Sequence, residues 1–186
     1  MTGHSLIPLD RAARMPAKHA LIYNRVLNAS VEKTWSIVST KEGISRWWIV
    51  PPTQFELKQG GRFHHHWEST IAKVEHLRLI DIDEPAGAYR GTGGMRFELA
   101  RIDEQNTNFL FVTTFGRDVV ADIPDAQPHG PGTGWADVAA GWHGMVDNLE
   151  RIFDDGVPRH SENELREFYK SYLDQQFRLV DMVERT

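Results

Sequence analysis

The clearest periodic pattern in the sequence lies in its last third. Apolar residues recur there at steps of three and four, the spacing of one helix face: Trp135, Val138, Ala139, Trp142, Met145, Val146, Leu149, Ile152 and Phe153. The pattern predicts one long helix. Because the apolar stripe is wide, we expect this helix to be buried against another element.

Alternating apolar and polar positions predict strands through the middle of the chain. In 62–68 the alternation places His65 on the same side as its aromatic neighbours. Segment 71–83 alternates imperfectly, so we expect a β-bulge near Leu79. The expected strands are 20–29, a short strand around Phe55 and Leu57, 62–68, 71–83, one long strand or a strand pair over 89–102, and 108–116.

Polar caps and prolines predict the remaining helices. Ser30 is a suitable N-cap for a short helix through Ser39, and a second short helix over 44–48 must end at the two prolines that follow. Ser161 is a suitable cap for a helix that runs to the C-terminus. Residues 1–17 show no sustained period, so we expect an irregular arm.

These elements together predict an α+β protein. A curved antiparallel sheet of about six strands would wrap around the long helix, with two short helices after the first strand and an extra terminal helix. The space between the sheet and the long helix is the natural place for an internal cavity.

The composition is that of a globular protein. The 186 residues are 40% hydrophobic and 25% charged, which excludes a collagen-like or wholly disordered chain. The formal net charge is −5 and the two signs are interspersed. Since nucleic-acid binding usually needs a basic face, we expect no nucleic-acid partner.

The absence of cysteine narrows the chemistry further. The sequence has no Cys, which excludes disulfides, thiol catalysis and cysteine-based zinc sites, and a reducing cytoplasm is the simplest location. No apolar run approaches the roughly 20 residues of a membrane span. The first 15 residues also lack a signal-peptide core. We therefore expect a cytoplasmic protein without a membrane span.

Several short segments stand in an order that resembles a known family. They are 28–35, Ile44-Ser45-Arg46-Trp47-Trp48, Gly60-Gly61-Arg62-Phe63, Asp83-Glu84-Pro85, 95–99, and Ala140-Gly141-Trp142 leading to Asn148-Leu149. Over about residues 20–156 the chain resembles the START-like (SRPBCC) superfamily, and within it the AHSA1-like family of the Hsp90 ATPase activator. The resemblance implies a helix-grip fold. We place the START-like domain at 18–156, after an arm at 1–17 and before an additional helix at 157–186.

The predicted cavity would have an aromatic lining, which favours a flat or apolar ligand. We therefore expect the protein to bind a small hydrophobic or aromatic molecule and to need no cofactor. The candidate ligand contacts are Trp47, Trp48, Phe63, His65, Trp67, Phe97, Phe111, Trp142 and Met145.

Sequence motifs of catalysis and metal binding are absent. There is no Gly-x-Ser-x-Gly elbow, phosphate loop, dinucleotide fingerprint or His-Glu-x-x-His motif. On a strand His64 and His66 would face away from His65, so the three cannot hold one ion, and we expect no metal site. Coordination of a surface metal by His64 and His66, with Glu68 beyond them, is the alternative. An enzyme resembling polyketide cyclases or hydrolases, with His65 as its proton carrier, is an alternative.

Two expectations concern protein partners. The resemblance to the Hsp90 activator implies a chaperone-partner role as a further alternative. The apolar seam of the C-terminal helix would either dock on its own domain or pair with a second copy to form a homodimer. The seam residues are Leu165, Phe168, Tyr172, Leu179 and Val183.

Overall fold

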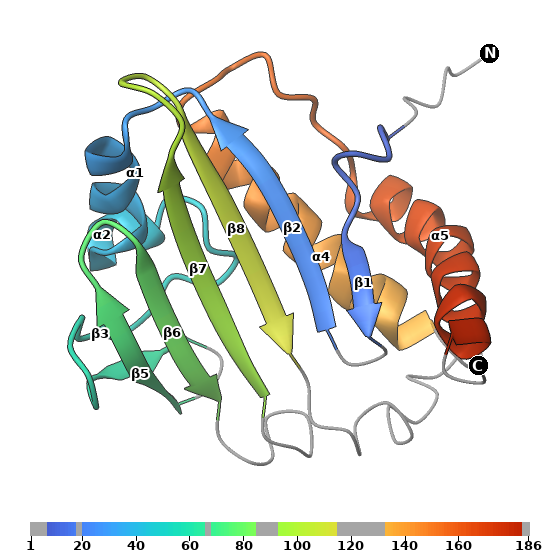
Figure 1. Cartoon of the computed structure of the whole chain (residues 1–186), viewed down its shortest axis with the longest axis horizontal. Coiled ribbons are helices and arrows are strands. Elements are labelled where there is room, and N and C mark those ends of the chain that lie inside the picture. The colour runs from blue at the N-terminus through green and yellow to red at the C-terminus, as the bar shows by residue number, and fades with distance from the viewer. Residues whose placement is uncertain (1–6, 18–19, 66–67, 85–92, 115–132, 184–186) are drawn as a thin grey trace.

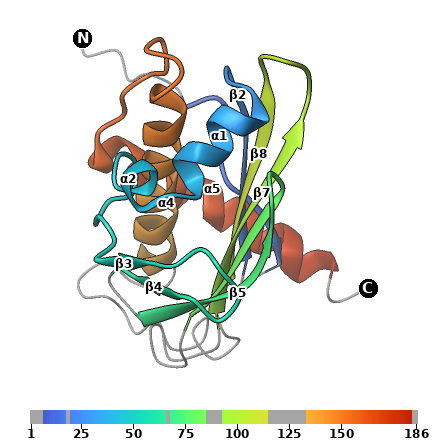
Figure 2. The same ribbon diagram turned by 90° about the vertical axis from the view of Figure 1, so that its left-hand side faces the viewer.

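The computed structural model describes residues 7–17, 20–65, 68–84, 93–114 and 133–183. An eight-stranded sheet forms one layer and the long helix α4 lies across one of its faces (Figures 1 and 2). Every strand pair is antiparallel, in the order β1-β2-β8-β7-β6-β5-β4-β3. The strands are β1 (Arg14–Ala17), β2 (Ala20–Leu27), β3 (Gln54–Phe55), β4 (Arg62–His64), β5 (Glu68–Glu75), β6 (Leu79–Glu84), β7 (Gly93–Arg101) and β8 (Thr107–Thr114).

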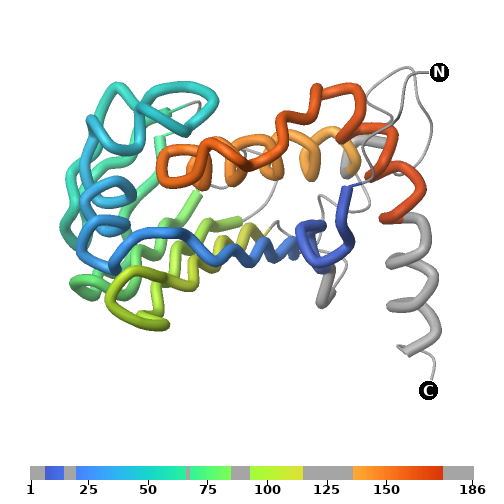
Figure 3. The backbone as a smooth tube through the Cα atoms, turned by 90° about the horizontal axis from the view of Figure 1, so that it is seen from above, coloured from blue at the N-terminus to red at the C-terminus, as the bar shows by residue number. Residues whose placement is uncertain are grey.

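The helices complete the predicted α+β arrangement. They are α1 (Val31–Val38), α2 (Lys41–Ile44), α4 (Thr133–Arg151) and α5 (Glu162–Val183). Seen from above, α4 runs over the sheet, with α1 at one end of the molecule and α5 at the other (Figure 3). The helix-grip fold predicted from the sequence is therefore confirmed.

The sheet has eight strands where the sequence pattern predicted about six. One addition lies in the arm that we expected to be irregular, because Arg14–Ala17 pairs with β2. The other addition arises because the predicted strand over 71–83 is divided between two strands, β5 and β6. The short strand predicted around Phe55 is β3, which pairs with β4. β1 has no apolar alternation and contains a proline, which a strand tolerates at a sheet edge. Its pairing was therefore invisible in the sequence pattern.

The predicted strand over 71–83 is a hairpin instead. β5 ends at Glu75 and β6 begins at Leu79, and between them Leu77 has a φ of 61°. The register shift lies between residues 71 and 73, not near Leu79. A leucine in the left-handed region is rare, so nothing in the sequence indicated a turn there. Residues 66–67 and 85–92 of the predicted strands lie outside the described part of the chain.

The short helices differ from prediction in one position. Ser30 caps α1 as expected, and its side chain accepts a hydrogen bond from the Lys33 amide. α2, however, ends at Ile44, where the predicted helix over 44–48 would begin, and Thr40 is the N-cap of α2. A Cβ on Gly43 would lie 2.3 Å from the Ile37 carbonyl oxygen. Glycine thus allows the close approach of α2 to α1.

The apolar stripe predicted for α4 and the Ser161 cap predicted for α5 are confirmed, whereas the side chains of Leu179 and Val183 lie outside the described residues. Seven apolar residues of α4 are buried: Ala136, Ala139, Ala140, Trp142, Met145, Val146 and Leu149. At the start of α5, Ser161 Oγ accepts from the Glu164 amide while the Glu164 carboxylate accepts from the Ser161 amide.

α5 docks on its own chain, beside α4 and β1 (Figure 1). The buried residues of this contact are Leu165, Tyr169 and Leu173. Phe168 and Tyr172 remain half-buried and stack on one another. Pairing of two copies through this part of α5 stays a prediction. No helix in the described ranges is long and apolar enough to cross a membrane.

Candidate functional site

An aromatic cluster lies between the sheet and α4. Trp48, in the segment after α2, lies at its centre. The centroid of the Trp48 ring lies 5.2 Å from the ring centroid of Trp47 and 5.4 Å from that of Phe63 on β4. Trp142 of α4 lies 5.6 Å from the same ring. Three elements that are distant in sequence therefore meet at one tryptophan.

The strands β7 and β8 close the cluster on the sheet side. The ring centroid of Phe97 lies 5.9 Å from that of Trp48 and 5.6 Å from that of Phe111. Phe111 in turn lies 5.3 Å from Trp142. Met145, one turn along α4, is fully buried in the same core. These contacts join both layers of the fold.

The structure brings the predicted contact residues together wherever it describes them. Trp47, Trp48, Phe63, Phe97, Phe111, Trp142 and Met145 belong to one buried cluster. His65 packs at its edge, 4.7 Å from the Phe63 ring. Trp67 lies outside the described residues. That this set contacts a ligand stays a prediction.

Two polar groups inside the cluster lack a partner. The indole N–H groups of Trp47 and Trp142 are buried, and neither donates a hydrogen bond to any described residue. A buried donor without an acceptor costs about 1–3 kcal/mol, and most native proteins satisfy such groups. Both N–H groups are thus available to an acceptor that is not part of the described chain.

A buried carboxyl group adjoins the edge of the cluster. Glu84, the last residue of β6, is 6% exposed. Its Oε1 atom lies 3.9 Å from Nε2 of His65 and accepts no hydrogen bond from the described residues. Burial raises the pKa of Glu84 to about 7. This carboxyl group can therefore give up or take a proton near neutral pH.

The other buried face of α4 carries charges, which sequence analysis did not predict. Asp147 lies 3.0 Å from an Arg11 guanidinium nitrogen and 3.2 Å from one of Arg25. Glu150 lies 2.6 Å from Arg11 and 3.3 Å from Arg25. The two carboxylates and two guanidinium groups form a charge-balanced buried cluster, which we call the ion cluster.

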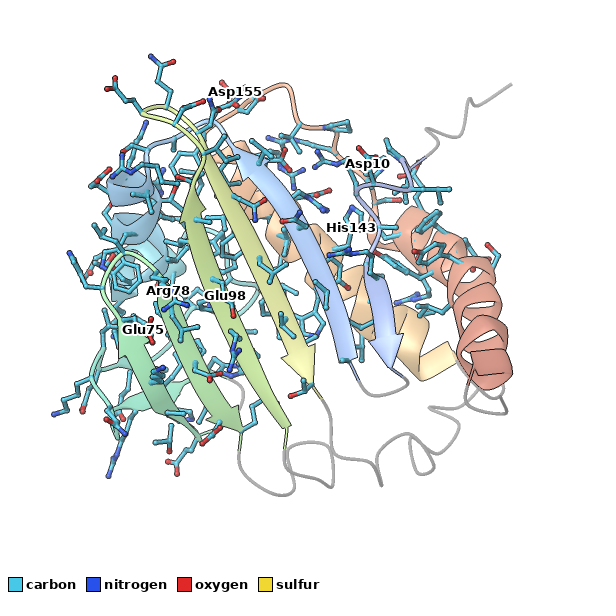
Figure 4. All side chains as sticks on the ribbon, in the orientation of Figure 1. Asp10, Glu75, Arg78, Glu98, His143 and Asp155 are labelled. Carbon is cyan, nitrogen blue, oxygen red and sulfur yellow. The ribbon has the colours of Figure 1, made fainter. Side chains whose placement is uncertain are left out.

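A chain of polar contacts extends from the ion cluster to α5. The Ala13 amide donates to the Tyr169 hydroxyl, which lies 2.8 Å from His143 Nδ1. His143 Nε2 lies 3.3 Å from Asp147 Oδ2. Figure 4 labels His143, which sits beside the N-terminal arm and α5. The cluster thus ties the arm and the terminal helix to α4.

The ion cluster determines the protonation of its members. Burial would raise the pKa of Asp147, but His143, Arg25 and Arg11 outweigh burial and hold that pKa well below its usual value. Burial lowers the pKa of His143 despite the nearby carboxylate. Asp147 therefore stays ionised near neutral pH, whereas His143 favours the neutral form.

The spacing of polar residues in the sequence gave one indication of the ion cluster. His143, Asp147 and Glu150 are spaced by four and three residues, so they share one side of α4. Because a helix side with three polar residues normally faces water, the sequence analysis did not predict that these residues are buried. As for metals, the described residues contain no group of three His, Cys, Asp or Glu that could hold an ion, and His66 lies outside them.

Comparison of the sequence with protein families shows which family it resembles over most of its length. The family described as Activator of Hsp90 ATPase homolog 1-like protein matches residues 28–154, which is more than half of the chain. The chain belongs to this family. The matched range of this AHSA1-like protein contains the complete described aromatic cluster. α5 and the arm with Arg11 lie beyond it. Comparison with curated proteins gave no match.

Solved structures share the fold of this AHSA1-like chain. CalU16 from Micromonospora echinospora is 16% identical with a TM-score of 0.60, over 85% of this chain and 89% of CalU16. A conserved protein of unknown function from Enterococcus faecalis is 12% identical with a TM-score of 0.63, over 89% and 91% of the two chains. DynU16, from the dynemicin biosynthetic locus, is 14% identical with a TM-score of 0.56, over 77% of this chain and 50% of DynU16. At these identities the likeness shows the fold alone.

Proposed function

We propose that the protein binds a small aromatic molecule that carries a hydrogen-bond acceptor, in the aromatic cluster between the sheet and α4. The observation that carries the proposal is the pair of buried indole N–H groups on Trp47 and Trp142, which find no acceptor among the described residues. The surrounding rings suit a flat apolar partner. Membership of a family with the helix-grip fold supports an internal site of this kind.

Binding of 2-naphthol, followed by tryptophan fluorescence, tests this proposal. Its hydroxyl oxygen can accept from an indole N–H, and its rings match the cluster. We expect Trp142→Phe to weaken 2-naphthol binding about three- to tenfold, because a neutral hydrogen bond contributes about 0.5–1.5 kcal/mol. Naphthalene has no acceptor, so its affinity should change less than that of 2-naphthol.

A matched variant separates the site from a general effect of the substitution. Trp35 of α1 is also buried in the hydrophobic core, but the described ring that it contacts is that of His76, not that of Trp48 or Trp142. Trp35→Phe should leave 2-naphthol binding within about twofold of wild type. Failure of 2-naphthol to bind saturably, or an equal loss in Trp35→Phe and Trp142→Phe, would contradict the proposal.

A second candidate function is acid–base catalysis at the edge of the same cluster. The specific observation in its favour is the His65 imidazole beside a carboxyl group whose pKa lies near 7. In ester hydrolysis the imidazole would take a proton from water as the water oxygen bonds to the carbonyl carbon, and it would return that proton to the leaving oxygen as the ester C–O bond breaks. This role extends the binding proposal rather than replacing it.

Hydrolysis of 2-naphthyl acetate tests the catalytic candidate. An enzyme that uses His65 should hydrolyse this ester faster than buffer does, and His65→Gln should lower the turnover on the order of 100-fold with little change in KM. A binder that lacks this chemistry should show the buffer rate before and after the substitution. A wild-type rate equal to that of buffer would therefore eliminate catalysis of this reaction.

A further inference from the structure

A hollow lies on the surface at the C-terminal end of α4, outside the aromatic cluster. It has a volume of about 670 Å³. Its walls come from the turn after α2, the last turn of α4 and the segment that leads to α5. Asp155, labelled in Figure 4, marks its rim. The lining residues are Arg46, Asn148, Arg151, Ile152, Asp155 and Arg159.

Positive charge predominates in this hollow, although the whole chain has a net charge of −5. Three of the lining residues are arginines and one is an aspartate. Arg46 and Arg159 are both exposed, and neither forms an ion pair with a described residue. These two guanidinium groups can therefore turn toward a bound anion.

The third guanidinium is held in place by neutral acceptors. Arg151 donates to the Pro158 carbonyl oxygen at 2.9 Å and to Asn148 Oδ1 at 2.5 Å. These bonds orient the side chain without neutralising its charge. Because its remaining N–H groups are not used in these bonds, Arg151 can contribute to an anion site with little loss of side-chain entropy.

Neighbouring carboxylates are engaged elsewhere. Asp154 accepts hydrogen bonds from Asn28 and from the Gly156 amide. Glu150, on the preceding turn of α4, pairs with Arg11 and Arg25. The partners of Asp154 are neutral, so Asp154 and Asp155 each contribute one negative charge, and the C-terminus of α4 contributes about half a charge more. Three guanidinium groups still outweigh these negative charges.

We propose that this hollow is a binding site for a small phosphorylated molecule. A phosphate monoester carries nearly two negative charges and three terminal oxygens, so it can accept from several guanidinium groups at once. A single carboxylate is satisfied by one arginine in a bidentate pair. Arginines from three separate segments therefore favour phosphate, and Ile152 offers an apolar contact for the rest of the molecule.

Isothermal titration with inorganic phosphate and with phenyl phosphate, at low ionic strength, tests this site. We expect saturable binding of both, with phenyl phosphate the tighter ligand. Arg46→Gln and Arg159→Gln should each weaken phosphate binding about fivefold or more, because each removes a charge-assisted hydrogen bond. Both residues are exposed, so both variants should fold as the wild type does.

Arg62 provides the matched control, since it is exposed on β4 and does not line the hollow. Arg62→Gln removes the same charge and should change phosphate affinity less than twofold. No saturable phosphate binding, an equal loss in Arg62→Gln, or succinate binding as tight as phosphate would each overturn the proposal. The site is independent of the aromatic cluster, so 2-naphthol binding should be unchanged in Arg46→Gln and Arg159→Gln.

Discussion

Glu84 and Asp147 are both buried carboxyl groups, yet their pKa values move in opposite directions. Burial raises the pKa of Glu84 to about 7, and no described cation lies within ion-pairing distance except the imidazole of His65. Asp147 is as well buried, but His143, Arg25 and Arg11 outweigh the burial and lower its pKa. The environment rather than burial itself decides the charge of each group.

The two carboxyl groups represent two differently built regions on either side of α4. Around Asp147 each buried charge has an opposite charge within 3.3 Å. Around Trp142 two indole N–H groups and Glu84 Oε1 make no hydrogen bond with the described residues. We infer that the ion cluster stabilises the fold, whereas the ligand contacts that we propose lie in the aromatic cluster.

The largest expected effect is that of breaking the ion cluster. Asp147→Ala leaves the buried Arg25 guanidinium with less compensating charge, and losing one partner of a buried ion pair costs about 3–5 kcal/mol. Urea unfolding at pH 7 should detect this loss. Asp83→Ala, at an exposed position on β6, should change stability by less than about 0.5 kcal/mol. A loss below about 1 kcal/mol in Asp147→Ala would mean that the cluster is not structural.

The pH dependence of Glu84→Gln should be nearly as large. In the wild type, the raised pKa of Glu84 makes the folded protein keep a proton that the unfolded chain loses, so this group lowers stability as the pH rises from about 4.5 to about 7. Gln does not titrate. Relative to wild type, the variant should therefore gain about 3 kcal/mol between pH 4.5 and pH 8 in urea unfolding. A stability difference that stays constant with pH would contradict the assignment.

Asp147 should act in the opposite sense. Because its pKa is lowered in the folded state, its stabilising contribution is present above about pH 4 and is lost as the pH falls below its unfolded pKa of 3.8. The stability difference between wild type and Asp147→Asn should thus shrink on acidification. The same unfolding series measures both carboxyl groups. If acidification changed the stability difference in the same direction for Glu84→Gln and Asp147→Asn, the distinction between the two regions would be wrong.

A smaller loss is expected where α5 joins the ion cluster. Tyr169→Phe keeps the ring but removes the hydroxyl that accepts from Ala13 and contacts His143, which should cost about 1–3 kcal/mol. Tyr172→Phe is the control, because Tyr172 is half-buried and its ring stacks on Phe168. Its stability should stay within about 0.5 kcal/mol of wild type. Equal stability of the two variants would show that the hydroxyl contributes nothing.

Local sequence signals were sufficient for most of the fold. The three- and four-residue spacing around Trp142 predicted α4, and Ser30 and Ser161 were identified as caps from their side-chain chemistry. Alternation placed Phe63 and His65 on one face of the sheet, and in the structure the centroids of their rings lie 4.7 Å apart. These features depend on residues close together in the chain, so the pattern of types and spacings is enough to determine them.

The tertiary structure alone decided which polar residues are buried. Asp147 and Glu150 are polar residues of α4, and they are buried because Arg11 of the arm and Arg25 of β2 pack against them. Glu84 likewise ends an ordinary strand, and its pKa depends on the burial created by elements distant in the sequence. Spacing along the chain predicts which side chains share a face. It does not reveal what will cover that face, because desolvation and ion pairing arise only after distant segments have packed together.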